Sequence, residues 1–245
     1  MMAKYHRVCT SLKDKGTLIP EGADLDKYKA GEAYISAYQY NEDHKKLFDK
    51  NKSVAGITDV TTDIIYFDLD NEDIEVARKD TIEVVNRLAN YEITSNQIKT
   101  CLSGNKGFHL ALHTTETFTP EEARSLAIKL AGDLDSFDSS IYNANRIIRI
   151  EGSVHPKTQL RKTELTFKEL QTLSIGDIKD LAKDEYDYLK PSKIEPIESF
   201  MKLTESVIKK DKAENIETTE TLDYLSNPYK LQPWKLALSQ GFFPN

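Results

Sequence analysis

The pattern of apolar and polar positions along the chain is centred on residues 61–70, TTDIIYFDLD. Residues 64–67 are all β-branched or aromatic, and a short apolar run of this kind predicts a buried strand. The run ends in Asp68-Leu69-Asp70. Because successive side chains of a strand point to opposite faces, Asp68 and Asp70 are expected to share one face at its end.

The same kind of pattern predicts the elements that follow. Apolar residues recur at spacings of three and four after the strand, and two glycines bracket the loop SGNKG between two further strands. In chain order the predicted elements are a helix over 72–91, strands over 97–102 and 108–113, a helix over 119–134, a strand over 146–150 and a hairpin arm to about 166.

The flanking parts of the chain have weaker patterns. Residues 30–50 have helical spacing followed by a polar turn, with Lys45 and Lys46 on a solvated face. Residues 53–60 predict the first strand of a hairpin. Thr166 and Ser174 each begin a capping box ahead of a polar helical stretch. A helix over about 196–210, a charged Thr-rich linker and a last helical piece complete the prediction.

Composition limits the class of protein. The 245 residues suit one large domain or two small ones, and 30% of them are charged. No apolar run approaches the roughly 20 residues of a membrane span, and residues 1–16 lack the apolar centre of a signal peptide. Cys9 and Cys101 are the only cysteines, so no zinc is expected. A cytoplasmic location is expected. The net charge of −7 argues against a protein that coats nucleic acid nonspecifically.

The two aspartates at the strand end form the first candidate site. Carboxylates on one face repel each other unless a cation lies between them, and Mg²⁺ or Mn²⁺ is the natural cation. An EF-hand loop starting at Asp68 fails, because Asp73 and Lys79 stand where Gly and Glu are required. Two alternatives stay open. The pair could form a turn that caps the next helix, or Asp68 could be the nucleophile of a haloacid-dehalogenase-type phosphatase.

The loop after the next strand is the second candidate site. Gly104 and Gly107 bracket Lys106, and glycines let backbone amides approach an anion closely. Ser103 adds a hydroxyl, and His109 could donate a hydrogen bond to a phosphate. The spacing of a Walker A loop is missing. The alternative is a hairpin turn with a hydrogen-bonded core histidine.

Residues 138–162, DSSIYNANRIIRIEGSVHPKTQLRK, form the third candidate site. They contain another carboxylate, Asp138, and several basic residues despite the acidic chain. Strand alternation would place Arg146 and Arg149 on opposite faces, so that only one of them faces the site. The alternative is a surface strand with ordinary basic residues.

Taken together, the three sites resemble archaeo-eukaryotic-type primases and primase-polymerases, in the branch carried by phages and plasmids. The resemblance lies in YFDLD, CLSGNKGFHLAL and FDSSIYNANRIIRIEGSVHPKTQLRK, in this order. It implies an α/β (α+β) fold, in which an N-terminal α/β module joins an RRM-like catalytic sheet. It further implies a template-dependent nucleotidyltransferase with two divalent ions, Mg²⁺ or Mn²⁺.

The resemblance also implies roles for individual residues. Asp68, Asp70 and Asp138 would hold the metals, and Asp138 is preferred over Asp133 and Asp135 because it follows Phe137 and precedes SSIYNANR. His109 would act at the catalytic centre and on the nucleotide. The remaining predicted nucleotide ligands are Ser103, Gly104, Lys106, Arg149, His155 and Lys157.

The expected partners are a single-stranded DNA template and NTPs or dNTPs, with no membrane. Residues 1–190 would form the catalytic core and residues 191–245 a helical extension. We expect these to be part of a longer protein, with a helicase domain downstream. The rival from another class is a catalytically silent module that binds single-stranded nucleic acid on the same fold. The phosphatase rival leaves the second and third sites unexplained.

Overall fold

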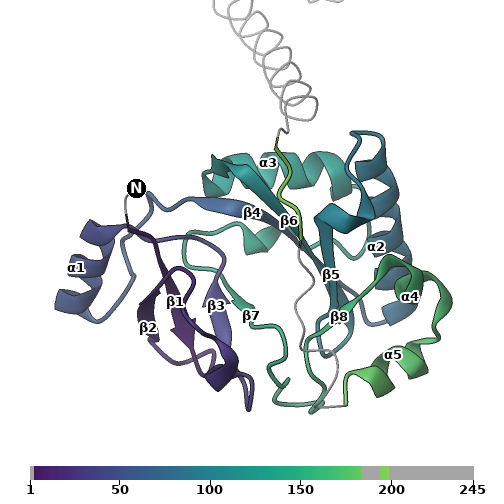
Figure 1. Ribbon diagram of the computed structural model, residues 1–245, viewed down its shortest axis with the longest axis horizontal. Coiled ribbons are helices and arrows are strands. Elements are labelled where there is room, and N and C mark those ends of the chain that lie inside the picture. Colours follow the sequence, from purple (N-terminus) through teal and green to yellow (C-terminus); the bar gives the residue numbers. More distant parts are fainter. Residues whose placement is uncertain (1–2, 184–193, 199–245) are drawn as a thin grey trace, which may run out of the picture. The chain divides into compact units, whose positions relative to one another are not determined.

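The computed structural model describes residues 3–183 and 194–198, and within them two four-stranded antiparallel sheets (Figure 1). The first sheet has the order β2-β1-β3-β7 and the second the order β4-β6-β5-β8. The strands of the first sheet are β1 (Tyr5–Cys9), β2 (Thr17–Pro20), β3 (Tyr34–Ser36) and β7 (Ile147–Arg149). Those of the second are β4 (Thr62–Asp70), β5 (Ile98–Leu102), β6 (Gly107–Phe118) and β8 (Thr163–Leu165).

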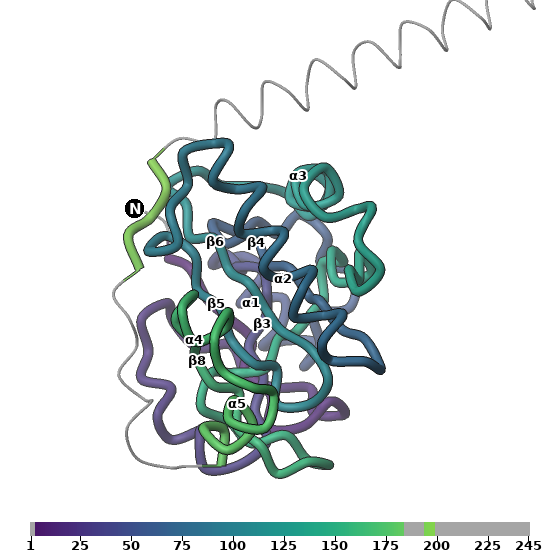
Figure 2. The backbone as a smooth tube through the Cα atoms, turned by 90° about the vertical axis from the view of Figure 1, so that its right-hand side faces the viewer, coloured from purple at the N-terminus to yellow at the C-terminus, as the bar shows by residue number. Residues whose placement is uncertain are grey.

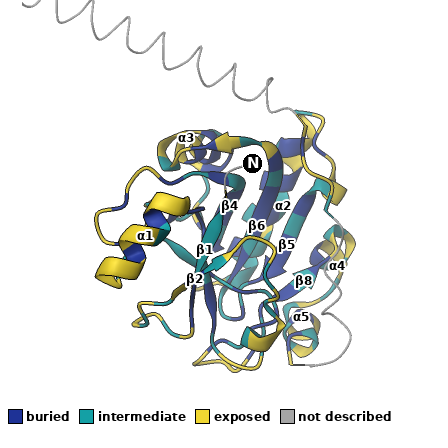
Figure 3. Cartoon of the chain, turned by 60° about the vertical axis from the view of Figure 1, so that its left-hand side comes forward, coloured by how far each residue is buried: buried dark blue, intermediate teal, exposed yellow. Residues whose placement is uncertain are grey.

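Helices pack on one face of the second sheet (Figure 2). The α-helices of the described residues are α1 (Glu42–Asn51), α2 (Ile74–Ala89), α3 (Pro120–Ala131), α4 (Phe167–Thr172) and α5 (Ile175–Leu181). Short 3-10 helices are η1 (Asp26–Tyr28), η2 (Ser95–Gln97) and η3 (Ser139–Ile141). Helix α1 instead lies near the first sheet and is largely exposed, apart from His44 and Phe48 (Figure 3). This arrangement confirms the mixed α and β fold class.

Alternation along β4 separates its two faces. Ile65, Phe67 and Leu69 are each 1% exposed or less, and they point to the helix-covered side. Tyr66 and Asp68 point the other way and line a cavity against residues of the first sheet. The predicted strand is therefore observed, with the aspartates on one face. Packing of the apolar face under the helices fixes the orientation of the polar face.

Helix ends follow the expected sequence signals. The predicted capping boxes at Thr166 and Ser174 are formed, and Thr119 forms another; each side chain accepts a hydrogen bond from the backbone of the third helical residue. Helix α2 buries the predicted apolar stripe, including Ala77 and Leu88. These local signals are reliable because a cap satisfies backbone groups that a helix end leaves unpaired.

The N-terminal predictions were partly wrong. Residues 53–60 form no strand, and Val54, Ile57 and Val60 instead bury their side chains from an irregular connection. The helix expected over 30–50 begins only at residue 42, because the side chain of Asn41 accepts hydrogen bonds from two backbone N–H groups and fixes the helix start there. The preceding residues pair as β3 with β1 and β7.

Two later predictions also differ from the structure. Strand β8 pairs with β5 of the second sheet, so it is not a hairpin arm of the strand at 146–150. Ile197 forms a parallel bridge with Thr114 where a helix was expected to start. The rest of that predicted helix, the charged linker and the last helical piece lie outside the described residues. In the described part of the chain, no helix is both long and apolar enough to span a bilayer.

Gly107 allows β6 to approach β4 closely, and this gives a first prediction. A Cβ atom there would lie 2.2 Å from the Leu69 carbonyl oxygen and 2.8 Å from Asp70 Cα. Gly107→Ala should lower the free energy of unfolding by about 1–3 kcal/mol, because backbone atoms must shift to accept the methyl group. Urea unfolding measures this. Gly31→Ala is the matched control, since a Cβ there meets nothing within 4 Å. Equal stability of the two variants would contradict the close approach.

Candidate active site

The antiparallel register of β4 and β6 places the first two motifs side by side. Asp68 lies opposite His109, and Asp70 lies opposite Gly107. Side chains that are directly opposite each other in an antiparallel pair share a face. The strand that carries the aspartates and the strand that follows the SGNKG loop therefore meet at one site.

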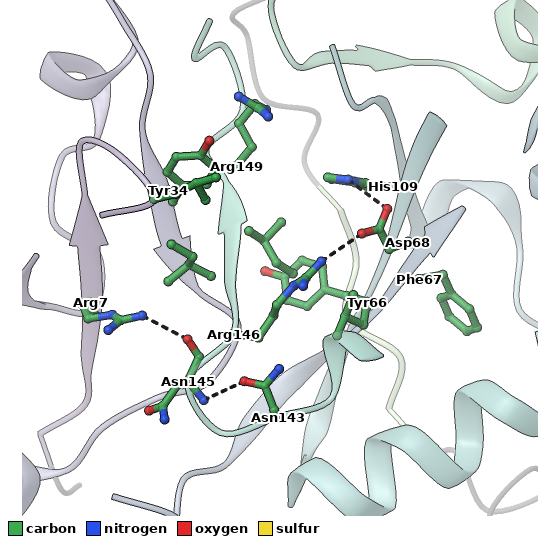
Figure 4. Close-up of a pocket in the computed structure, with 14 residues that line it drawn as sticks. Arg7, Tyr34, Tyr66, Phe67, Asp68, His109, Asn143, Asn145, Arg146 and Arg149 are labelled. Carbon is green, nitrogen blue, oxygen red and sulfur yellow. Dashed lines mark hydrogen bonds and ion pairs between the residues drawn. The ribbon is translucent and has the colours of Figure 1, made fainter. Parts of the chain in front are cut away.

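Both carboxylate oxygens of Asp68 contact basic side chains (Figure 4). His109 Nε2 lies 3.3 Å from Oδ1, and an Arg146 guanidinium nitrogen lies 3.1 Å from Oδ2. Burial opposes ionisation of Asp68, but the charges and hydrogen bond of His109 and the charge of Arg146 outweigh it, so the pKa of Asp68 is lowered. Asp68 is thus a carboxylate held ionised by its neighbours.

Asp70 behaves in the opposite way. Burial raises the pKa of Asp70, Lys106 counters this, and the negative charge of Asp68 adds to the rise. Lys106 Nζ lies 3.7 Å from Asp70 Oδ2 and 2.5 Å from Glu72 Oε1. The pair is therefore unequal, since Asp68 has two close cationic partners and Asp70 shares one lysine with Glu72.

Asp138 lies on the other side of Asp68. Its backbone N–H donates to the Asp68 carbonyl at 2.9 Å, and Leu69 and Phe137 form an antiparallel bridge. This pairing sets Asp138 opposite Asp68, on the face that also carries Asp70. The Asp138 carboxylate itself caps η3, accepting from Ser140 N–H at 2.8 Å and from Ser140 Oγ at 2.9 Å. Asp133, by contrast, pairs with Arg87.

The carboxylates suit a hard divalent ion by chemistry and by face. As the side chains stand, however, no group of three or more His, Cys, Asp or Glu in the described residues could hold a metal ion. Asp68, Asp70 and Asp138 each have partners for their carboxylate oxygens within the protein. A metal site here requires these partners to be exchanged.

His109 has one bonded and one unbonded ring nitrogen. Nε2 faces Asp68, whereas Nδ1 is buried and has no hydrogen-bond partner. Burial lowers the pKa of His109 even though Asp68 raises it, and the positive charges of Lys162 and Arg149 lower it further. A buried nitrogen without a partner is costly, and it indicates a position prepared for a ligand.

Three arginines converge on the same place. Arg7, Arg146 and Arg149 line a cavity of about 510 Å³ together with Asp68 and His109, here called the arginine cavity (Figure 4). The Nε atom of each arginine is buried without a hydrogen-bond partner. Guanidinium groups have only donors, so the three arginines suit an anion with several acceptor oxygens. Nδ1 of a neutral His109 whose Nε2 donates to Asp68 is instead an acceptor.

Different elements hold these arginines. Arg7 comes from β1, and its guanidinium donates to the Asn145 carbonyl at 3.0 Å. Arg149 ends β7, with its guanidinium carbon 5.3 Å from the centre of the Tyr34 ring. The expectation that only one of Arg146 and Arg149 faces the site was wrong, because β7 begins at Ile147 and strand alternation does not extend to Arg146.

A second cavity of about 470 Å³ adjoins the first and shares Tyr66, His109, Ile148 and Arg149 with it. Lys162 lines it and donates from Nζ to the Arg149 carbonyl at 3.0 Å. Burial lowers the pKa of Lys162. Several basic side chains that were expected to line a groove therefore form hydrogen bonds within the protein. Arg161, for example, donates to the Lys29 and Gly152 carbonyls.

Several predicted nucleotide ligands line neither of these two cavities. Ser103 N–H donates to the Gly107 carbonyl, and Gly104 has the left-handed φ of +88° beside the segment 155–161. His155 Nδ1 accepts from the N–H groups of Lys157 and Thr158 and so closes a turn. The structure thus places Asp68, His109 and Arg149 on the arginine cavity. Lys106 pairs with Asp70, and the Asp138 backbone bonds to that of Asp68. Asp70, Lys106 and Asp138, like Ser103, Gly104, His155 and Lys157, line neither cavity.

Arg7 and Tyr34 were not noticed in the sequence, and Arg146 and Lys162 were not selected as site residues. Tyr34 lies on β3, which pairs with the distant β7, and Arg7 lies on β1, which pairs with β3, so no local pattern reveals them. Arg146 could have been chosen from its place just before a short strand, where alternation is not yet established.

Comparisons with known proteins were made for the sequence and for the fold. No family model matches the chain, and no curated protein matches its sequence. Among solved structures, the polymerase domain of Mycobacterium tuberculosis Ligase D in complex with DNA matches with a TM-score of 0.47 and 14% identity, over 82% of this chain and 84% of that one.

Two further solved structures match. The cyanophage S-2L primase-polymerase domain has a TM-score of 0.41 and 18% identity, over 74% of this chain and 89% of that one. The primase RepB′ has a TM-score of 0.45 and 10% identity, over 92% of this chain and 63% of that one.

The unequal aspartates give a second prediction. In a metal chelator at pH 7, Asp68→Asn should lower the free energy of unfolding by about 1–3 kcal/mol, because Arg146 loses its ion pair and the amide keeps only one of the two acceptor oxygens that serve Arg146 and His109. Asp70→Asn should leave it unchanged or raise it, because burial disfavours that charge. The loss of unfolding free energy in Asp68→Asn should be complete above the ordinary aspartate pKa of about 3.9. It should vanish as the pH falls through the lowered pKa of Asp68 in the folded protein. Urea unfolding of both variants tests this, and equal losses would contradict it.

Proposed function

We propose that the chain is a template-dependent nucleotidyltransferase, a primase or primase-polymerase that joins nucleoside triphosphates on a DNA template. One observation carries the proposal. Arg7, Arg146 and Arg149 line the arginine cavity beside Asp68 and His109, and each of these guanidinium groups has a buried Nε without a hydrogen-bond partner. A site of this kind suits a triphosphate next to carboxylates, which is the substrate arrangement of nucleotidyl transfer.

The arginines would bind and orient the triphosphate. Charge-assisted hydrogen bonds from guanidinium groups are strong and geometrically specific for phosphate oxygens. Arg149 is already restrained by the Tyr34 ring and Arg7 by its bond to Asn145, so little conformational entropy remains to be lost on binding. His109, neutral and donating from Nε2 to Asp68, would hold that carboxylate in place and offer an acceptor at Nδ1.

Asp68, Asp70 and Asp138 would hold two divalent ions, Mg²⁺ or Mn²⁺, on their common face. When bound, such ions align the attacking hydroxyl with the α-phosphate and stabilise the charge that develops on the leaving pyrophosphate. The protein's own part is positioning. Register fixes Asp68 between His109 and Asp138, and Lys106 balances Asp70 from the loop before β6.

The proposed partners are single-stranded DNA and NTPs or dNTPs. In the proposed division, residues 1–190 act as the catalytic core and residues 191–245 as a helical extension, with a helicase domain in a longer protein. A role in phage or plasmid replication belongs to the same proposal.

A synthesis assay tests this function and gives a third prediction. Single-stranded DNA, with and without a primer, is incubated with labelled NTPs or dNTPs and with Mg²⁺ or Mn²⁺ in separate reactions. We expect template-dependent products from the wild type and none from Asp70→Asn, whose fold should be intact on the grounds given above. DNA binding without any synthesis would favour the catalytically silent module, and phosphate release without DNA would favour a phosphatase.

The arginine cavity gives a fourth prediction. Arg149→Gln and Arg7→Gln should each weaken nucleoside triphosphate binding by about tenfold or more, because a charged hydrogen bond contributes about 1.5–3 kcal/mol. Isothermal titration calorimetry measures the affinity. The matched control is Lys45→Gln with Lys46→Gln on α1, where the two lysines pair with Asp49 and Asp43 on the helix surface. Loss of nucleotide affinity in the control and not in the arginine variants would place the nucleotide on another surface.

A further inference from the structure

Both carboxylate oxygens of Asp68 have partners within the protein in the absence of a ligand. Its two oxygens contact His109 Nε2 at 3.3 Å and an Arg146 guanidinium nitrogen at 3.1 Å. The side chain of Asp68 is 20% exposed. A divalent ion that binds Asp68 must therefore displace, or be repelled by, a guanidinium that already satisfies one oxygen.

The Arg146 side chain can move away from the Asp68 carboxylate oxygen without disturbing the fold. Its backbone is fixed on both sides, since its N–H donates to the Asn143 carbonyl and its carbonyl accepts from Ala37 N–H, each at 2.9 Å. The side chain is 32% exposed and lines the arginine cavity, where its Nε has no partner. Movement of the side chain alone would bring its donors to a ligand in the cavity.

We propose that Arg146 is an exchangeable cation that keeps Asp68 closed to metal until a nucleotide enters. The triphosphate in the arginine cavity takes the guanidinium from Asp68, and the carboxylate oxygen so released becomes a metal ligand. The inference rests on the proposed function and adds to it an order of assembly, in which nucleotide and metal bind together.

Linkage makes this arrangement measurable. If nucleotide binding removes a like charge from the metal site, it raises the affinity for metal, and metal must raise the affinity for nucleotide by the same factor. Arg149 offers the contrast within the same cavity. Its guanidinium lies over Tyr34 and donates to the Val154 carbonyl at 3.5 Å, and no ion pair joins it to Asp68. Arg149 should bind nucleotide without controlling Asp68.

The experiment titrates Mn²⁺ into the nucleotide-free protein and follows free Mn²⁺ by electron paramagnetic resonance. The relevant site is the one that Asp68→Asn removes. Arg146→Gln should raise the Mn²⁺ affinity of this site by about tenfold or more, because a unit charge a few ångströms away is lost from a partly buried position. Arg146→Lys should stay close to the wild type, and the matched control Arg149→Gln should not change the affinity.

A second titration measures nucleotide binding in a chelator. Arg146→Gln and Arg149→Gln should both weaken it. Asp68→Asn should strengthen it in the wild-type background, where it frees Arg146, and much less in the Arg146→Gln background. This double-mutant cycle isolates the Asp68–Arg146 pair from the general effect of removing a negative charge. Thermal unfolding of every variant shows that the proteins are folded.

The outcomes separate the inference from the proposed function. If the wild type synthesises DNA but Arg146→Gln binds nucleotide-free Mn²⁺ no better than the wild type, the inference is overturned and the function stands. An equal gain in Arg149→Gln would also overturn it, because the effect would then be one of net charge. If the wild type binds neither nucleotide nor Mn²⁺, with both titrations negative, the proposed function and the inference fail together.

Discussion

The pairing of β4 with β6 is the constraint on which the site depends. One antiparallel register sets Asp68 opposite His109, and the same register sets Leu69 opposite Phe108 in the core. A slip of one residue would bury the aspartates under the helices and expose the apolar side chains, which costs far more than the local strain at Gly107. The hydrophobic packing of α2 and α3 on one face therefore fixes the chemistry on the other.

The polar face is arranged at a cost to stability. Several donors around the arginine cavity are buried without partners, and Lys162 is buried with a lowered pKa. Such groups weaken a fold unless a ligand completes their hydrogen bonds. Cationic side chains contributed by both sheets lie beside the aspartates at the end of β4. In the free protein they pair with groups of the protein itself, whereas in a complex they would pair with the ligand.

The sequence was sufficient for most elements of the second sheet, though not for the pairing of β8, and it was insufficient for the first sheet. Strand β4, helices α2 and α3 and their caps follow from periodicity and from capping side chains, which act within a few residues. The first sheet is built from short strands, and its edge strand β7 comes from residues 147–149, far along the chain from β3. Arg7 and Tyr34 reach the site only through this pairing. His155 and Lys157 were predicted as ligands from basic residues near a motif, and this pattern does not reveal that the turn uses a histidine nitrogen internally.

The late position of β7 and β8 has a consequence for synthesis of the chain on the ribosome. The first sheet lacks β7 until residue 149 has emerged, and the second lacks β8 until residue 165 has emerged. The N-terminal strands therefore have an unpaired edge while α2, β6 and α3 are being synthesised. Unpaired strand edges can pair with other chains. One late segment therefore completes both sheets, and a fragment that ends before residue 146 would carry the acidic strand without Arg146 and Arg149.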